Sequence, residues 1–247
     1  MTLAMFLTDP GELDLAVVGT AYTLDGAEGR HAATVKRMRV GERLMLSDGQ
    51  GRRVTGTVAE ATPGELRIDV ERVEDEEPPG ARLTLVQALA KADRDDAAIE
   101  AATEYGVDRV IPWQAERSIV QWRGERAEKA RQKWVDTVRA AAKQSRRAWV
   151  PEVEDLVDTA GLARRISSAC IAYVLHEDAV VPLAGQPIPA VGEVLLIVGP
   201  EGGIGESELA KLTAAGAHPV RLGTSVLRSS SAGPAAIAVL SAEDRWR

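Results

Sequence analysis

The sequence predicts an α/β protein in which a small N-terminal region of short strands precedes a domain built on a mainly parallel sheet. Three observations support this fold class. Residues 169–175 (ACIAYVL) and 193–199 (EVLLIVG) are near-continuous apolar runs, as expected of parallel strands covered on both faces. Strand-like and helix-like patterns alternate from residue 82 onward. The segment EDEEPPG, residues 74–80, separates the two regions with charge, two prolines and a glycine.

The N-terminal region is expected to consist of short strands joined by turns. Residues 41–60 contain two apolar-rich segments around Asp48 and Gly49, which predicts a hairpin. Residues 66–73 (LRIDVERV) alternate apolar and polar side chains, as a half-buried strand does. The predicted division of the chain is a first domain at 1–73, a linker at 74–80 and a second domain at 81–247.

The second domain is expected to alternate strands and helices. Its predicted strands lie at 82–89, 107–113, 169–175, 193–199 and 218–223, and its predicted helices at 95–106, 125–147, 206–216 and 232–247. Gly106 closes the first helix, and Trp134, Val138 and Ala142 recur at helical spacing in the second. Because ligands bind at the carboxyl ends of parallel strands, the segments 175–177, 199–203 and 222–228 are expected to meet.

Composition indicates a soluble globular protein. Hydrophobic residues make up 45% and charged residues 27% of the chain, no apolar run reaches the roughly 18 residues of a membrane span, and the N-terminus shows no signal-peptide pattern. The single cysteine, Cys170, is expected to be a buried strand residue, and a chain with one cysteine fits a reducing cytoplasm. His31, His176 and His218 lack metal-ligand spacing, so we expect no metal.

Charge is unevenly distributed. The net charge is −7, yet residues 30–53 carry seven basic against two acidic side chains, and residues 116–147 carry ten against four. These stretches are either solvated surfaces or a footprint for a nucleic-acid backbone, and the sequence pattern leaves both interpretations open.

The segment LLIVGPEGGIGESEL, residues 195–209, resembles a nucleotide-binding turn without its defining residues. It lacks the third glycine of a dinucleotide fingerprint and the lysine of a phosphate-binding loop, which argues against a nucleotide-dependent oxidoreductase. Pro200 offers no N–H, and the carboxylate of Glu201 would repel a phosphate. The loop therefore favours a neutral or cationic ligand such as S-adenosylmethionine, although a plain strand-to-helix turn remains an alternative.

The serine run RSSSAG, residues 228–233, raises the alternative of a serine hydrolase. The nucleophile turn of such enzymes needs a glycine two residues before the serine, and Ser229 occupies that place. Neither His176 nor His218 is tied to a serine by the sequence. Ser231 is instead expected to cap the last helix.

An ordered set of motifs resembles one known family. The set consists of His31 with residues 36–39 and Gly41, Asp48-Gly49, residues 104–107, 111–112, 116–118 and 142–145 with Arg147 and Pro151, then residues 199–203, 222–223 and 226–228. Together they resemble the RsmE family of the SPOUT superfamily, ribosomal RNA methyltransferases that methylate N3 of a uridine in 16S RNA. The resemblance covers nearly the whole chain.

This resemblance implies a PUA-like barrel at the N-terminus, a trefoil knot in the C-terminal domain, an obligate homodimer, and S-adenosylmethionine bound in a bent form at the knot. Small-subunit 16S ribosomal RNA would be the partner. The residues expected to bind the cofactor are Leu175, His176, Glu177, Val198, Gly199, Pro200, Glu201, Gly202, Gly203, Leu222, Gly223, Val226 and Leu227.

Two residues are candidates for catalysis. Arg228 is expected to stabilise a uracil anion or to hold a phosphate, with a structural ion pair as the alternative. Glu201 is expected to face the positive end of the cofactor, with a cap on the following helix as the alternative. The residues expected to bind RNA are Lys36, Arg37, Arg39, Arg52, Arg53, Arg117, Arg123, Arg126, Lys143, Arg146 and Arg147.

One departure from the family pattern matters. Where the family carries Thr-Glu-Thr-Ala after the arginine, this chain has Ser229, Ser230 and Ser231 before Ala232. The glutamate position is therefore occupied by Ser230. An RNA-binding module that kept the fold and lost or weakened the chemistry is the second hypothesis.

Overall fold

The computed structural model of the chain describes residues 3–91 and 94–246. These residues form two compact units. The first unit extends to Pro78 and also includes Ala142–Val150, whereas the second contains Pro79–Ala141 and the chain from Pro151 onward.

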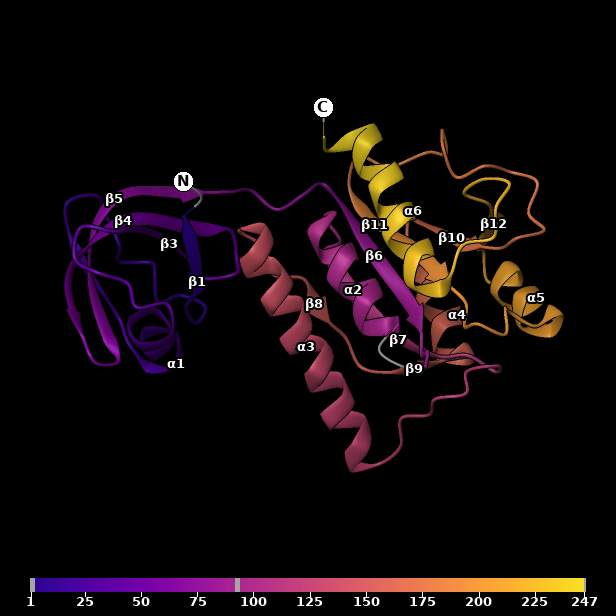
Figure 1. Ribbon diagram of the computed structural model, residues 1–247. Helices are drawn as coiled ribbons and strands as arrows, with labels where there is room; N and C mark the ends of the chain where they lie inside the picture. Colours follow the sequence, from indigo (N-terminus) through magenta and orange to yellow (C-terminus); the bar gives the residue numbers. More distant parts are fainter. Residues whose placement is uncertain (1–2, 92–93, 247) are drawn as a thin grey trace. The chain divides into compact units, whose positions relative to one another are not determined.

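The first unit is built on a five-stranded sheet in the order β1-β3-β4-β5-β2 (Figure 1). The strands are β1 (Ala4–Leu7), β2 (Ala21–Leu24), β3 (Arg43–Ser47), β4 (Arg52–Thr62) and β5 (Glu65–Asp75). Strands β1 and β3 are parallel, and the other neighbours are antiparallel. Strands β3 and β4 form the hairpin predicted around Asp48 and Gly49. Burial alternates along β5 at Leu66, Ile68 and Val70, as its sequence predicts.

A helical segment in this unit differs from the expectation of strands and turns alone. Residues Gly26–Arg30 form α1 and His31–Val35 form a π-helical turn, η1. Because glycine has low helix propensity, the sequence does not predict a helix at these residues. Packing forms them instead: a Cβ on Gly29 would lie 2.5 Å from the Leu24 carbonyl oxygen, and Ala32 is fully buried.

Residues Ala142–Val150 belong to the first unit although they lie far along the chain. Lys143 Nζ contacts both carboxylate oxygens of Glu28 at 2.8 Å, and Gly51 N–H donates to the Ala148 carbonyl oxygen at 3.1 Å. Trp149 also packs against Gly51, where a Cβ would lie 2.6 Å from Trp149 Cζ2. No periodic pattern in the sequence indicates this return, because it depends on contacts between residues far apart in the chain.

The second unit contains a parallel sheet in the order β12-β10-β11-β6-β7-β8, with β9 also paired to β7. Every ladder in it is parallel, which confirms the predicted α/β class. Its strands are β6 (Ala81–Ala88), β7 (Arg109–Gln114), β8 (Glu152–Val153), β9 (Val157–Asp158), β10 (Ile171–Leu175), β11 (Gly192–Val198) and β12 (His218–Val220). Its helices are α2 (Arg94–Glu104), α3 (Glu125–Ser145, which ends in the first unit), α4 (Thr159–Ser168), α5 (Glu206–Ala214) and α6 (Ser229–Asp244).

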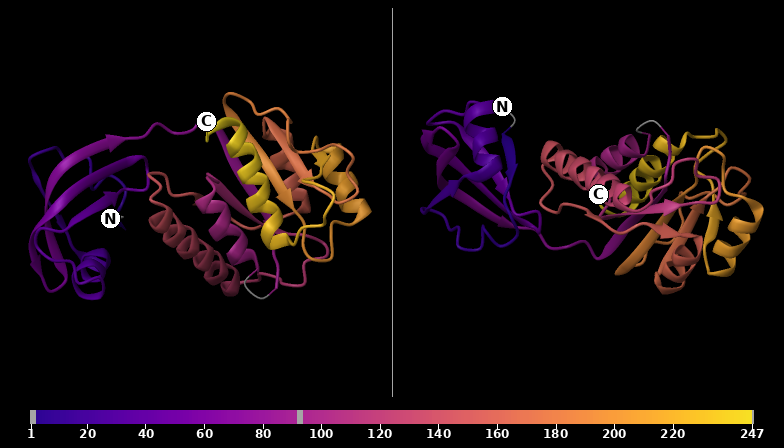
Figure 2. Two further views of the ribbon diagram at one scale, coloured as in Figure 1. Left: turned by 45° about the horizontal axis from the view of Figure 1, so that its top comes forward. Right: turned by 90° about the horizontal axis from the view of Figure 1, so that it is seen from below.

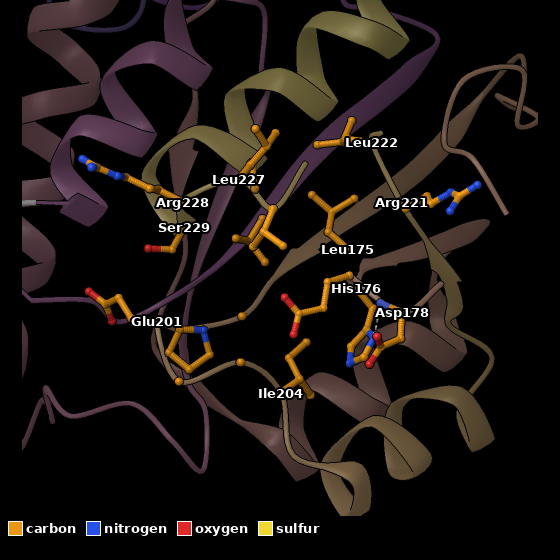
Figure 3. A pocket seen from close by; sticks show the side chains of 18 of the residues that line it. Leu175, His176, Asp178, Glu201, Ile204, Arg221, Leu222, Leu227, Arg228 and Ser229 are labelled. Atoms are coloured by element: carbon orange, nitrogen blue, oxygen red, sulfur yellow. Dashed lines mark hydrogen bonds between the residues drawn. The ribbon is translucent and has the colours of Figure 1, made fainter. Parts of the chain in front are cut away.

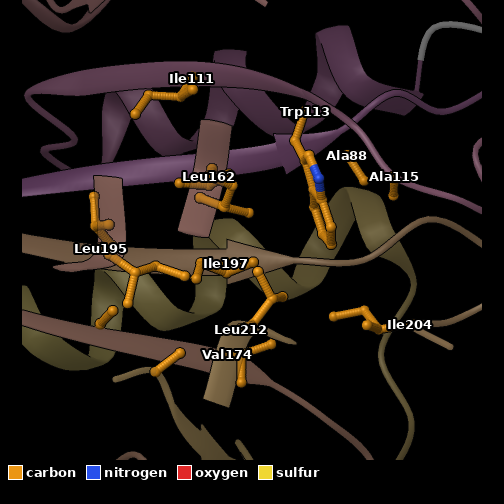
Figure 4. Close-up of a cluster of buried hydrophobic side chains, with 14 residues drawn as sticks. Ala88, Ile111, Trp113, Ala115, Leu162, Val174, Leu195, Ile197, Ile204 and Leu212 are labelled. Atoms are coloured by element: carbon orange, nitrogen blue, oxygen red, sulfur yellow. The ribbon is translucent and has the colours of Figure 1, made fainter. Parts of the chain in front are cut away.

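Helices cover both faces of this sheet (Figures 1 and 2). Helices α2 and α6 pack on one another and on β6, whereas α4 and α5 lie on the opposite face. Figure 4 shows the cluster beneath α4 and α5, where Trp113, Leu162, Ile197 and Leu212 are buried. Coverage of both faces explains why β10 and β11 have near-continuous apolar sequences. Helix α4 and the two-residue strands β8 and β9 were not among the predicted elements.

The last helix differs from the prediction at its start. Helix α6 begins at Ser229 with Arg228 as its N-cap, so Ser231 lies inside the first turn and is not the cap. Gly233 allows a close approach to the sheet, since a Cβ there would lie 2.8 Å from Leu85 Cδ1. Arg247, the last residue of the predicted helix, lies outside the described residues.

The expectation for Cys170 was wrong. Strand β10 begins at Ile171, and Cys170 precedes it with an exposed side chain beside Val191. The apolar run at 169–175 therefore starts two residues before the strand. Throughout residues 3–91 and 94–246, each helix is either too short or too polar to cross a membrane.

Candidate active site

A pocket lies where the carboxyl ends of neighbouring strands meet (Figure 3). Strands β12, β10 and β11 are adjacent in the sheet, so the segments that follow them converge. The cavity has a volume of about 800 Å³. All of the residues expected to bind the cofactor line it, from Leu175 to Leu227, and so does Arg228. Lining residues outside the predicted cofactor and catalytic sets are Arg94, Arg117, Asp178, Ile204, Glu206, Arg221, Thr224, Ser225, Ser229 and Ala232.

One wall of the pocket is the turn from β11 into α5. Gly203 has a left-handed φ of 69°, and its N–H donates to the Pro200 carbonyl oxygen at 2.9 Å. Gly199 is needed for space, because a Cβ there would lie 2.7 Å from Ile204 Cγ1. The turn ends at Gly205, the N-cap of α5. Glycines therefore form a tight wall that exposes backbone to the pocket.

The opposite wall is the segment between β12 and α6, and it exposes apolar side chains. Val226 is 73% exposed and Leu227 is 40% exposed. Both line the pocket with Leu175 and Leu222, which lie between its two polar ends in Figure 3. Exposed apolar surface of this kind favours contact with an apolar part of a ligand.

Glu201 lies at one polar end and forms a specific pair. Its Oε1 accepts from the Lys91 backbone N–H at 3.2 Å and from Arg94 Nη1 at 3.1 Å. Partial burial raises the pKa of the Glu201 carboxyl, but backbone donors and Arg94 lower it by more, so it lies below its ordinary value. Glu201 does not cap α5, because the cap is Gly205 and no side chain bonds there.

Arg228 lies at the same end of the pocket as Glu201 and Ser229 (Figure 3). Its side chain is exposed, and within the part of the chain that the structure describes no ion pair of Arg228 is present. The structural ion pair considered as its alternative role is therefore not formed among these residues. Ser229 is buried, and the first turn of α6 contains no acidic residue, so nothing in that turn offsets the positive charge of Arg228.

Arg117 supports the glycine turn. Its Nη1 donates to the Gly202 carbonyl oxygen at 2.9 Å. The preceding residue is fixed by Glu208, a fully buried carboxylate in the first turn of α5 that accepts from the Glu116 N–H at 3.0 Å and from Thr159 Oγ1 at 2.5 Å. A buried carboxylate is held in place by such donors, so these contacts tie the segment before α3 to the pocket wall.

His176 follows β10 at the other end of the pocket, near Asp178 and Arg221 (Figure 3), and Glu177 also lines the pocket. His176 Nδ1 accepts from the Asp178 N–H at 3.3 Å. Among the described residues, no group of three or more histidine, cysteine, aspartate or glutamate side chains is arranged to hold a metal ion.

The predicted RNA-binding residues fall into two groups. Within the described part of the chain, the exposed side chains that form no ion pair are Lys36, Arg37, Arg39, Arg123 and Arg126. The others are engaged or half-buried: Arg52 pairs with Asp75, Arg53 pairs with Glu76 and contacts the Arg146 carbonyl oxygen, Lys143 pairs with Glu28, Arg117 binds the pocket wall, and Arg146 and Arg147 are half-buried. Arg53 and Arg146 are thus brought together within the first unit.

Sequence reasoning missed Arg94 as a pocket residue. The signal that could have found it is the order of the sheet, since β6 is the neighbour of β11 and Arg94 begins the helix that follows β6. Strand order could not be read from the sequence. The role of Arg117 in the pocket was missed for the same reason, because it follows β7.

The chain is similar to known RNA methyltransferases over most of its length. Residues 76–241 match the RNA methyltransferase domain family, and residues 24–71 match the RNA methyltransferase PUA domain family. The ribosomal RNA small subunit methyltransferase E of Mycobacterium bovis is 43% identical over 233 residues, which cover 92% of this chain and 89% of the relative.

Two solved structures have a similar fold. The Neisseria gonorrhoeae ribosomal RNA small subunit methyltransferase E, bound to S-adenosyl methionine, has a TM-score of 0.84 and 26% identity over 98% of both chains. A Legionella pneumophila protein in complex with the cofactor SAM has a TM-score of 0.83 and 26% identity, also over 98% of both chains. The expected PUA-like fold of the N-terminal region is confirmed by the domain match and these neighbours.

Proposed function

We propose a function for this chain on the premise that it belongs to the ribosomal RNA small subunit methyltransferase E family. The chain is an S-adenosylmethionine-dependent ribosomal RNA methyltransferase, and the atom that it methylates is N3 of a uridine in 16S RNA. The observation that carries this conclusion is that all of the predicted cofactor-binding residues line one pocket together with Arg228.

The residues of the pocket fit S-adenosylmethionine. This molecule combines an adenosine, a sulfonium and an amino-acid end, and it carries no phosphate. The apolar side chains of Leu175, Leu222 and Leu227 suit the adenosine. Pro200 provides no N–H and Glu201 provides a negative charge, both of which disfavour a phosphate at this turn.

The reaction requires an aligned nucleophile. When bound, the cofactor supplies a methyl group carried on a positively charged sulfonium. Uridine N3 carries a proton, which must leave for the bond to carbon to form. The pocket residues contribute mainly by positioning N3 for an in-line approach. Arg228, a cation at the pocket with an exposed side chain, favours the uracil anion that results from loss of this proton.

Glu201 is expected to contact the positive end of the cofactor. Both hydrogen bonds described above are accepted by Oε1, so neither of them occupies Oε2. The lowered pKa of Glu201 keeps the carboxylate ionised at neutral pH. An ionised oxygen at the pocket suits the positive end of the cofactor.

The residues proposed to bind RNA in the first unit are Lys36, Arg37 and Arg39, and those in the second unit are Arg123 and Arg126. All five side chains are exposed and can exchange counterions for RNA phosphates. The trefoil knot and the homodimer implied by the family resemblance stay predictions. Sedimentation of the purified protein tests the dimer.

The proposed function is tested with labelled S-adenosylmethionine and small ribosomal subunits from a strain that lacks this methylation. We expect label in 16S RNA, recovered after digestion as 3-methyluridine. Label at another atom would refute the proposed position, and tight RNA binding without any label would favour the binding module suggested by Ser230. Heat-inactivated protein and subunits that already carry the methylation are the controls.

A further inference from the structure

We propose that Arg94 is an RNA-binding residue of the active site, held in place by Glu201, and that it binds a phosphodiester of the RNA strand beside the methylated nucleotide. This inference rests on the proposed function. Its basis is the ion pair between the two side chains at the rim of the pocket.

The location of Arg94 follows from the fold. It is the first residue of α2, after the carboxyl end of β6, and β6 is the direct neighbour of β11 in the sheet. The Glu201 carboxylate fixes it from the other side, because Oε1 bonds both Arg94 Nη1 and the Lys91 N–H. The segments that follow two neighbouring strands, β6 and β11, thus hold the Arg94 guanidinium at the pocket.

The pair leaves most of the guanidinium available. Glu201 engages only Nη1, whereas an arginine has five N–H donors in a planar fork. The Arg94 side chain is 49% exposed, compared with 25% for Glu201. Half-exposed donors beside a cavity can take a second acceptor without breaking the first contact, and a phosphodiester fits the fork in a bidentate manner.

The charges at this end of the pocket favour an anion. Arg94 and Arg228 are two cations that line the pocket, and Glu201, which pairs with Arg94, supplies one negative charge. The first turn of α6 contains no acidic residue, so it adds no negative charge. A cofactor without phosphate provides only its carboxylate as an anion, whereas the RNA strand that enters the site carries a phosphodiester on each side of the target base.

Glu201 acts on RNA through Arg94 in this arrangement. Loss of Glu201 would release the arginine and leave its charge, so RNA attraction would persist while the position of the strand relaxed. Glu201 is therefore a positioning residue for the RNA, in addition to its role at the cofactor.

The test measures binding without catalysis, so that its failure is distinct from failure of the proposed function. The dissociation constant for unmethylated small ribosomal subunits is measured between 50 and 200 mM KCl for the wild type, Arg94→Ala and Arg94→Lys. Affinity for S-adenosylmethionine is measured by calorimetry. The control is Arg82→Ala, which removes an exposed arginine at the amino end of the same strand, β6.

We expect Arg94→Ala to reduce the slope of log affinity against log salt by about 0.7 to 0.9, the value for one phosphate contact. Between 50 and 200 mM KCl this is an about three-fold smaller loss of affinity. Cofactor affinity should stay at the wild-type value, Arg94→Lys should keep the slope, and Arg82→Ala should change neither.

An unchanged slope in Arg94→Ala would overturn the inference. So would a loss of cofactor affinity with an unchanged slope, which would assign Arg94 to the cofactor carboxylate. The positioning step is tested by Glu201→Gln alone and combined with Arg94→Ala, with the KM for subunits as the readout. If Glu201 acts on RNA through Arg94, the double variant has the same KM as Arg94→Ala, and multiplicative effects would contradict this coupling.

Discussion

The substitution Gly199→Ala tests whether the wall of the pocket depends on close packing between Gly199 and Ile204. The added Cβ would lie 2.7 Å from Ile204 Cγ1 and 3.3 Å from its Cδ1. Ile204 is only 7% exposed and belongs to the core cluster beneath α4 and α5. Because the Ile204 side chain is closely packed and can move little, the turn that carries Glu201 must shift instead.

The expected destabilisation is about 1–3 kcal/mol, the usual cost of an added methyl group in a packed site. Ile204→Ala removes both side-chain atoms that the new Cβ would meet, and by itself should cost about 2–5 kcal/mol. In the Ile204→Ala background, Gly199→Ala should cost less than about 0.5 kcal/mol, since the clash is gone. The two substitutions are therefore coupled by about 1–2 kcal/mol.

Urea unfolding of the four proteins measures this coupling, and calorimetry with S-adenosylmethionine reports the shape of the pocket. Gly223→Ala is the matched control, because a Cβ there meets no atom within 4 Å and its φ is not left-handed. It should change stability by less than about 0.5 kcal/mol. Equal costs of Gly199→Ala in both backgrounds would refute the packing argument.

Three further outcomes are expected. Arg228→Ala should lower the rate of methyl transfer by roughly 10²-fold, the effect of removing one group that stabilises developing charge. The affinity for S-adenosylmethionine, measured by calorimetry, should stay unchanged. A rate of methyl transfer near that of the wild type would remove Arg228 from the mechanism. Charge reversal at Arg37 and Arg39 should weaken RNA binding in filter assays at low salt, and the deficit should shrink as salt is raised; unchanged low-salt affinity would exclude this surface. Glu208→Ala should destabilise the protein in urea unfolding by about 2–5 kcal/mol, because it removes the acceptor of the Glu116 N–H and of the Thr159 hydroxyl. Glu208→Gln, which keeps an acceptor oxygen, should cost clearly less, and equal costs would show that these hydrogen bonds contribute little.

Much of the second unit could be predicted from the sequence because its pattern is strong. The runs that became β10 and β11 are apolar on both faces, which only a covered parallel strand requires. The rule that ligands bind at carboxyl strand ends then brought the segments after β10, β11 and β12 together, and the pocket contains all of them. Local pattern and a general topological rule were sufficient for this part.

The features that were missed depend on contacts between distant residues. Arg94 required the neighbour of β11 to be known, and the buried Glu208 accepts hydrogen bonds from Thr159 and the Glu116 N–H, which lie far from it in the sequence. The turns α1 and η1 contain two glycines and form because Gly29 fits against backbone. Such features have no periodic signal in one sequence.

The return of Ala142–Val150 to the first unit has a consequence for how the protein can be divided. A fragment that stops at Pro78 would lack the Ala148 carbonyl oxygen, which accepts from both Ser47 Oγ and the Gly51 N–H. Fusion of that fragment to another protein would expose these groups to water and loosen the hairpin that carries them. The first unit is therefore encoded by two separated stretches of the gene, and a fragment cut at a single boundary would lack part of its hydrogen bonding.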